Sequence, residues 1–172
     1  MKTPASSPPP QTPTRPSGWP LAALGGILLV AFALRVVSAQ GGLWLDEIWS
    51  LKNIALARTL PGDADWLALF FHDNTHALNT IYMAAIGPNA PALAYRGLSI
   101  VCGTASVAVA AAIGWRRSPR EGLIGAAMVG LSYPLVHYAG EARGYAPMLL
   151  AVLAAYHLLE TWLENPSPGR AI

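Results

Sequence analysis

Two adjacent carboxylates, Asp46 and Glu47, lie in the segment GGLWLDEIWS, directly after the first long apolar run of the chain. Two later segments, HDNTH and GEARGY, add further ionisable side chains. A carboxylate of this kind can take a proton from a hydroxyl, while an arginine holds an anionic group in a charge-assisted hydrogen bond. The residues of interest for such chemistry are Asp46, Glu47, Arg58, His72, Asp73, His76, Arg96, Glu141, Arg143 and Tyr145.

The carboxylates and histidines also have simpler interpretations. Asp46 and Glu47 can be the start of a helix, where negative charge offsets the macrodipole. His72 and His76 are four residues apart, so on a helix they could share a face and bind a divalent metal ion together with Asp46. The spacing fixes no third strong ligand, and the sequence therefore leaves a metal possible without requiring one.

The arginines have structural alternatives as well. Glu141 and Arg143 are close enough in the chain to pair with each other and close a loop. Arg35 and Arg96 lie near the ends of apolar runs, where long cationic side chains often snorkel to the membrane surface. All of these groups map to one predicted side of a membrane, and this convergence favours a site over scattered structural charges.

The composition indicates a protein that faces lipid. Hydrophobic residues make up 53% of the 172 residues, charged residues only 12%, and the mean hydropathy is +0.39. Soluble domains carry about 25% charged residues. A net charge of +2 without a dense basic cluster gives no footprint for nucleic acid. Cys102 is the single cysteine, so no disulfide can form within the chain.

The apolar runs predict an all-α integral membrane protein with four transmembrane helices. Each run approaches the roughly 20 residues that span a bilayer. The Pro-rich residues 1–18 are expected to be disordered, residues 19–163 form the transmembrane domain, and residues 164–172 form a C-terminal tail. The expected spans are residues 19–39, 93–115, 122–139 and 145–163, with a long outer loop at 40–92. Small residues recur in the second and third spans, as where membrane helices approach closely.

Lysine and arginine predict the orientation. Lys2 and Arg15 precede the first span, Arg116, Arg117 and Arg120 separate the second and third, and Arg170 follows the fourth. The positive-inside rule places this side, and the N-terminus, in the cytoplasm, with the loop 40–92 on the outer face of a multi-pass membrane protein. The small residues before Gln40 also resemble a signal-peptide cleavage site, which would leave the same loop outside.

The outer loop begins with a predicted surface helix. In DEIWSLKNIALAR, Ile48, Leu51 and Ala55 fall on one face, whereas Asp46, Ser50, Asn53 and Ala57 fall on the other. This pattern is typical of an amphipathic juxtamembrane helix. The apolar piece at 77–86 spans about half a bilayer and is expected to pack at the outer interface or to dip into the membrane.

Four segments resemble a known family in order and spacing: LWLDEIWS, HDNTHALNTIYM, YRGLSIVCGT and YAGEARGYA. They are similar to the N-terminal part of integral-membrane glycosyltransferases of the C-type fold, which include the protein O-mannosyltransferases and the aminoarabinose transferase of lipid A. The resemblance runs from about Arg35 to Leu163. One departure is Ala77, because many relatives have proline after the histidine that matches His76.

The resemblance implies transfer of a sugar from a polyprenyl-phosphate donor to an acceptor on the outer face, in the cell envelope and by expectation at a bacterial inner membrane. It implies that Asp46 is the catalytic base, with Glu47 beside it. Arg143, together with Arg58 or Arg96, would hold the phosphate, and His72, Asp73, His76, Glu141 and Tyr145 would contact substrate. No cofactor is required, although a divalent metal is possible.

Relatives carry many more spans, so we expect this chain to be a fragment, a truncated product or one part of a split enzyme, with a missing C-terminal half or partner subunit. A non-catalytic membrane scaffold or a subunit that binds a lipid-linked sugar is the alternative. A small transporter fits less well, because the second to fourth spans carry almost no charge at mid-depth.

Overall fold

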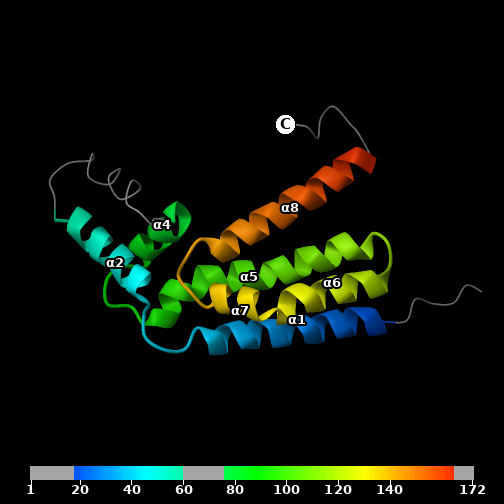
Figure 1. Cartoon of the computed structure of the whole chain (residues 1–172), viewed down its shortest axis with the longest axis horizontal. Helices are drawn as coiled ribbons and strands as arrows, with labels where there is room; N and C mark the ends of the chain where they lie inside the picture. Colours follow the sequence, from blue (N-terminus) through cyan, green and yellow to red (C-terminus); the bar gives the residue numbers. More distant parts are fainter. Residues whose placement is uncertain (1–17, 60–75, 165–172) are drawn as a thin grey trace, which may run out of the picture.

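The computed structural model describes residues 18–59 and 76–164, and all of the regular secondary structure in these ranges is helical. Figure 1 shows the helices in chain order. Their bounds are α1 Trp19–Ser38, α2 Leu45–Ala57, α4 Ala77–Ile86, α5 Ala92–Trp115, α6 Pro119–Leu131, α7 Tyr133–Ala139 and α8 Tyr145–Glu164. Most of the expected N-terminal and C-terminal tails, and the loop residues 60–75, lie outside the described ranges.

Three of the described helices are long and apolar enough to cross a membrane. These are α1, α5 and α8, with 20, 24 and 20 residues. At 1.5 Å per residue each is about 30 Å or longer, the thickness of the hydrocarbon core. Helices α6 and α7, with 13 and 7 residues, are each too short and qualify only as a pair, and the chain bends by 58° between them. The all-α prediction is confirmed, and the predicted four spans are matched if this bent pair counts as one.

Helix α5 lies at the centre of the bundle and packs against α1, α6 and α8 (Figure 1). Small residues permit the close approach: a Cβ on Gly103 would stand 2.7 Å from the Ala139 Cβ, and one on Gly130 would stand 3.3 Å from the Ala31 Cβ. Outward-facing apolar side chains of α1 and α8, such as Leu29 and Leu158, stay exposed. A surface of this kind suits lipid contact and follows from the near-absence of charge in these segments.

The break between α6 and α7 follows from Pro134. Proline has no N–H, so the carbonyl of Gly130 four residues earlier loses its helical partner. Arg35 of α1, which is 0% exposed, donates from Nη1 to that carbonyl at 3.2 Å and from Nη2 to the Val129 carbonyl at 3.2 Å. The prediction that Arg35 snorkels to the surface is therefore wrong. It replaces hydrogen bonds that the bent helix cannot make.

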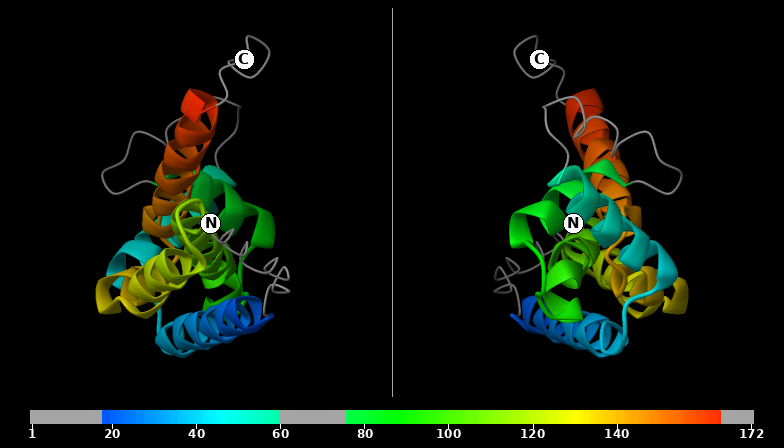
Figure 2. Two further views of the ribbon diagram at one scale, coloured as in Figure 1. Left: turned by 90° about the vertical axis from the view of Figure 1, so that its right-hand side faces the viewer. Right: turned by 90° about the vertical axis from the view of Figure 1, so that its left-hand side faces the viewer.

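Helices α2 and α4 sit at the end of the bundle where α1 ends and α5 begins (Figures 1 and 2). The loop that joins α7 to α8, residues 140–144, reaches the same end. We call this the loop end. At the opposite end, Arg116 pairs with Glu160 and Glu164 of α8.

Helix α2 turns its polar side toward the protein. Glu47, Ile54 and Ala57 are buried, whereas Ile48 and Leu56 are exposed. The residues of the predicted polar face are half-buried or buried in the structure: Asp46, Ser50, Asn53 and Ala57. Ala57 packs with Ile54 in the core because α4 and α5 cover this side of the helix.

Candidate functional site

The loop end brings together polar residues from four parts of the sequence. The first turn of α2 supplies Asp46 and Glu47, and α5 supplies Arg96. His76 is the residue before α4, and the α7–α8 loop supplies Glu141 and Arg143. These groups meet because α1 and α7 end, and α5 and α8 begin, at this same end of the bundle (Figure 1).

Glu47 and Arg96 form a buried ion pair at the base of the site. Their side chains are 0% and 2% exposed, and Arg96 reaches both carboxylate oxygens, with Nη2 2.7 Å from Oε2 and Nε 3.0 Å from Oε1. The remaining Arg96 N–H groups donate to the carbonyls of Ala39, Gly41 and Gly42. A guanidinium has five N–H donors. These hydrogen bonds therefore give every N–H of Arg96 a protein acceptor.

Glu47 also ties two backbone segments together. It accepts the N–H of Trp44 at 2.8 Å and the N–H of Ala142 at 2.5 Å. Burial by itself raises the pKa of Glu47, but the hydrogen bonds from Arg96, Ala142 and Trp44 outweigh it, and the net pKa lies below its ordinary value. The pair therefore acts as a clamp. Asp46 directly precedes Glu47, and Arg143 directly follows Ala142, so the clamp fixes Asp46 and Arg143 relative to each other.

This arrangement bears on two of the predicted roles. Phosphate binding by Arg96 would require it to give up protein acceptors, and proton transfer by Glu47 would require it to leave four donors. The predicted surface anchoring of Arg96 is wrong, since the whole residue is only 1% exposed. Both side chains hold the site in place, and any direct contact with substrate stays a prediction.

Asp46 and Arg143 form the accessible pair above the clamp. Arg143 Nη1 lies 3.1 Å from Asp46 Oδ2 and 3.7 Å from Glu141 Oε2. The Asp46 side chain is 34% exposed and that of Arg143 16%, so both remain within reach of a ligand. The guanidinium also lies 4.9 Å from the ring centre of Tyr145, a favourable cation–π contact. The predicted pairing of Glu141 with Arg143 is confirmed.

His76 borders this pair. Its ring packs against Tyr145 with centroids 5.2 Å apart, and Gly144 leaves the space it occupies: a Cβ there would stand 2.8 Å from His76 Nδ1. The buried Nε2 has no hydrogen-bond partner among the described residues. Burial, followed by the charge of Arg143, lowers the pKa of His76 below its usual value, although Asp46 opposes this. The lowered pKa favours the neutral ring, which can accept one hydrogen bond and donate another.

Glu141 also pairs with His137, a residue that the sequence analysis did not identify. Its Oε1 lies 3.4 Å from His137 Nε2, one helical turn earlier. Burial raises the pKa of Glu141, with Arg143 and His137 opposing the shift. Both residues line a polar pocket of about 240 Å³ beside Trp44 and Gln40. The four-residue spacing of His137 and Glu141 was the signal that could have revealed this pair.

An apolar groove of about 350 Å³ begins beside the polar residues and follows α7 and α8 away from them. Tyr145 and Tyr138 lie at its polar end, and Leu149 and Val152 line it further along α8. Tyr145 belongs to both environments, because it contacts Arg143 and His76 as well as the groove. The loop end thus combines an anion-binding arginine with an adjoining apolar channel.

Other predicted site residues are not brought into this cluster. Arg58 follows the last residue of α2, about 18 Å along the helix axis from Asp46, and it donates to the Ala84 carbonyl of α4. His72 and Asp73 lie outside the described residues. Within residues 18–59 and 76–164, no group of three or more His, Cys, Asp or Glu side chains is arranged to hold a metal ion.

Sequence comparison adds no relative: the chain matches no protein-family profile, no curated protein and no solved structure.

Proposed function

We propose that this chain takes part in the transfer of a sugar from a polyprenyl-phosphate donor to a hydroxyl acceptor at the membrane surface. One observation carries the proposal. The Asp46–Arg143 pair lies at the loop end, next to an apolar groove that runs along α7 and the candidate span α8. Such a site suits a ligand with an anionic head and a long apolar tail.

The groups present match the needs of the reaction. The Asp46 carboxylate takes the proton of the acceptor hydroxyl as its oxygen bonds to the anomeric carbon of the sugar. The bond from that carbon to the phosphate oxygen breaks, and its electron pair leaves with the polyprenyl phosphate. Arg143 stabilises the charge on the departing phosphate. His76, whose lowered pKa favours the neutral ring, can hydrogen-bond a sugar or phosphate oxygen.

The ion pair between Asp46 and Arg143 gives the donor a second effect. A phosphate that binds Arg143 competes with Asp46 for the same guanidinium donors. As the phosphate takes over these donors, the Asp46 carboxylate becomes available to an acceptor hydroxyl. Donor binding would then precede activation of the base.

The alternative is a non-catalytic subunit that binds a lipid-linked sugar or acts as a membrane scaffold. The contact between Asp46 and Arg143 favours this alternative, since an ion pair of this kind can be structural. The two functions share a prediction for Arg143 but differ for Asp46. A base is required for transfer, whereas a binding subunit needs only the anion site.

Membranes from cells that express the full chain, supplied with a radiolabelled polyprenyl-phosphate sugar, test the proposal. Wild type should bind the donor and transfer the label to an acceptor. Arg143→Gln should weaken donor binding about 10-fold to 100-fold, the size of one charge-assisted hydrogen bond. Arg120→Gln, which replaces an exposed arginine in the first turn of α6 at the opposite end, is the matched control. Equal donor binding by the two variants would contradict the assignment of Arg143 as the residue that binds the donor phosphate.

A further inference from the structure

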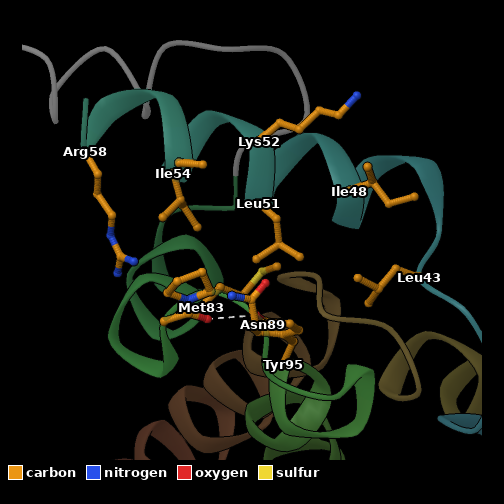
Figure 3. A pocket seen from close by; sticks show the side chains of 12 residues that line it. Leu43, Ile48, Leu51, Lys52, Ile54, Arg58, Met83, Asn89 and Tyr95 are labelled. Carbon is orange, nitrogen blue, oxygen red and sulfur yellow. Dashed lines mark hydrogen bonds between the residues drawn. The ribbon is translucent and has the colours of Figure 1, made fainter. Parts of the chain in front are cut away.

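A second apolar cavity, of about 450 Å³, lies between α2, α4 and the first turn of α5 (Figure 3). Leu51 and Ile54 of α2 form one wall, Met83 of α4 and Tyr95 of α5 the other. None of its described lining residues also lines the groove along α7 and α8. Its size falls in the range of small-molecule pockets. The proposed transfer reaction does not use it.

The rim of this cavity is cationic. Arg58 extends along one edge in Figure 3, and Lys52 points outward from the same helix, 5.6 Å from the ring centre of Trp49. Among the described residues that line the cavity there is no carboxylate. The acidic residues of α2 are Asp46 and Glu47, and these are engaged by Arg143 and Arg96. An anion at the rim would therefore meet positive charge without opposing carboxylates from α2 or α4.

The surroundings of the cavity suit a lipid interface. One of its lining residues, Tyr95, is in the first turn of the candidate span α5. Apolar side chains on both flanking helices are exposed, among them Ile48, Leu56 and Ile81. Apolar surface below a pair of cations is the pattern of elements that lie in the interface of an anionic membrane.

We propose that this cavity binds an anionic glycerophospholipid, with an acyl chain inserted between α2 and α4. Arg58 contacts the lipid phosphate, and Lys52 adds positive charge nearby. One Arg58 Nη2 hydrogen bond goes to the Ala84 carbonyl, and the exposed remainder of the guanidinium faces the rim. The bound lipid fills the space between the helices and holds α2 and α4 in register. The site is separate from the one proposed for the polyprenyl-phosphate donor.

Photolabelling tests the proposal on the full chain in nanodiscs. The probes are phosphatidylglycerol and phosphatidylcholine carrying the same photoreactive acyl chain, and the labelled peptides are mapped by mass spectrometry. Wild type should incorporate the anionic probe several-fold more than the zwitterionic one, at residues of α2, α4 and the start of α5. Arg58→Gln should lower the anionic labelling about fivefold, and Arg120→Gln should leave it unchanged.

A second pair of variants tests the cavity itself. Ala55 lines it and is exposed, so Ala55→Trp should fill its mouth and lower the labelling without disturbing the core. Ala85 is an exposed alanine on α4 that does not line the cavity, and Ala85→Trp is the matched control. Labelling that stays unchanged in Ala55→Trp would contradict the proposal.

Other results would overturn the assignment of the ligand. Equal labelling by the two lipids would exclude recognition of the phosphate charge. Absence of labelling at these helices would mean that the chain's own residues or a partner fill the cavity. Competition by polyprenyl phosphate would make it part of the donor site. The measurement uses no sugar donor and should give the same result with Asp46→Asn, so it stands or falls independently of the transfer reaction.

Discussion

Removal of the Glu47 charge should destabilise the chain more than any exposed substitution. In Glu47→Gln, the Arg96 guanidinium stays charged and 1% exposed, while the amide presents N–H groups toward donors. Loss of one partner of a buried ion pair costs about 3 to 5 kcal/mol. We expect this loss in the free energy of unfolding, measured by titration with a denaturing detergent from mild micelles.

A surface pair in the same chain supplies the control. Glu164 pairs with Arg116, but its side chain is 64% exposed, and exposed pairs contribute about 1 kcal/mol or less. Glu164→Gln should therefore lower the unfolding free energy by less than about 1 kcal/mol. Replacement of both clamp residues, in Glu47→Leu with Arg96→Met, should recover about 1 to 3 kcal/mol of the summed single losses.

The pH dependence gives the clamp a second signature. The folded pKa of Glu47 lies below its unfolded value of 4.5, so the folded state holds the carboxylate charged. Its contribution is fully present above pH 4.5 and is lost as the pH falls through the folded pKa. Wild type should lose stability in this window more steeply than Glu47→Gln. If Glu47→Gln costs no more than Glu164→Gln, the clamp does not stabilise the loop end and the reasoning fails.

Three further predictions concern the elements around the clamp. Arg35→Met should lower the unfolding free energy by about 2 to 4 kcal/mol, because buried carbonyls of Val129 and Gly130 lose their donor; Pro134→Ala should offset part of this loss by restoring an N–H, and an additive double variant would contradict the account. Gly144→Ala should displace His76 and reduce donor binding, whereas Gly26→Ala, with nothing within 4 Å of the added Cβ, should leave binding unchanged; equal binding by both would exclude the packing role of Gly144. The raised pKa of Glu141 gives a stability contribution that is present below pH 4.5 and lost as the pH rises through the folded pKa; Glu141→Gln should lack this decline in a series of thermal melts, and an unchanged decline would assign it to another group.

Hydrophobic runs predict most of the fold because in lipid each span must satisfy its own backbone hydrogen bonds. This rule places α1, α5 and α8 within a residue of their expected ends. The third span is the exception. A proline at position 134 is a sequence signal for a helix break. The sequence could not show that Arg35, from a helix distant in the chain, would be buried there and donate to the Val129 and Gly130 carbonyls.

The sequence likewise predicts one part of the site and not another. The gathering of Asp46, Glu141 and Arg143 at one end follows from the number and length of the apolar runs. The choice of partners does not, because it depends on tertiary distances. Sequence reasoning assigned Arg96 to an anchor or a phosphate, whereas the short Ala39–Gly42 turn brings it onto Glu47 and three carbonyls. Sequence reasoning also grouped Arg58 with Arg96 and Arg143 as a phosphate ligand, whereas Arg58 lies at the far end of α2 and donates to the Ala84 carbonyl.

The assignment of Asp46 as a base is tested most directly by single-turnover transfer in Asp46→Asn, with donor binding measured on the same membranes. The amide keeps the size of the side chain and its place in the first turn of α2, so the clamp and Arg143 should still position a bound donor. We expect donor binding within about threefold of wild type, since the charge-assisted contact of Arg143 remains. The transfer rate should fall about 10²-fold to 10⁴-fold, the contribution of a positioned base. Transfer at the wild-type rate by Asp46→Asn would contradict the account and leave Asp46 as a structural partner of Arg143.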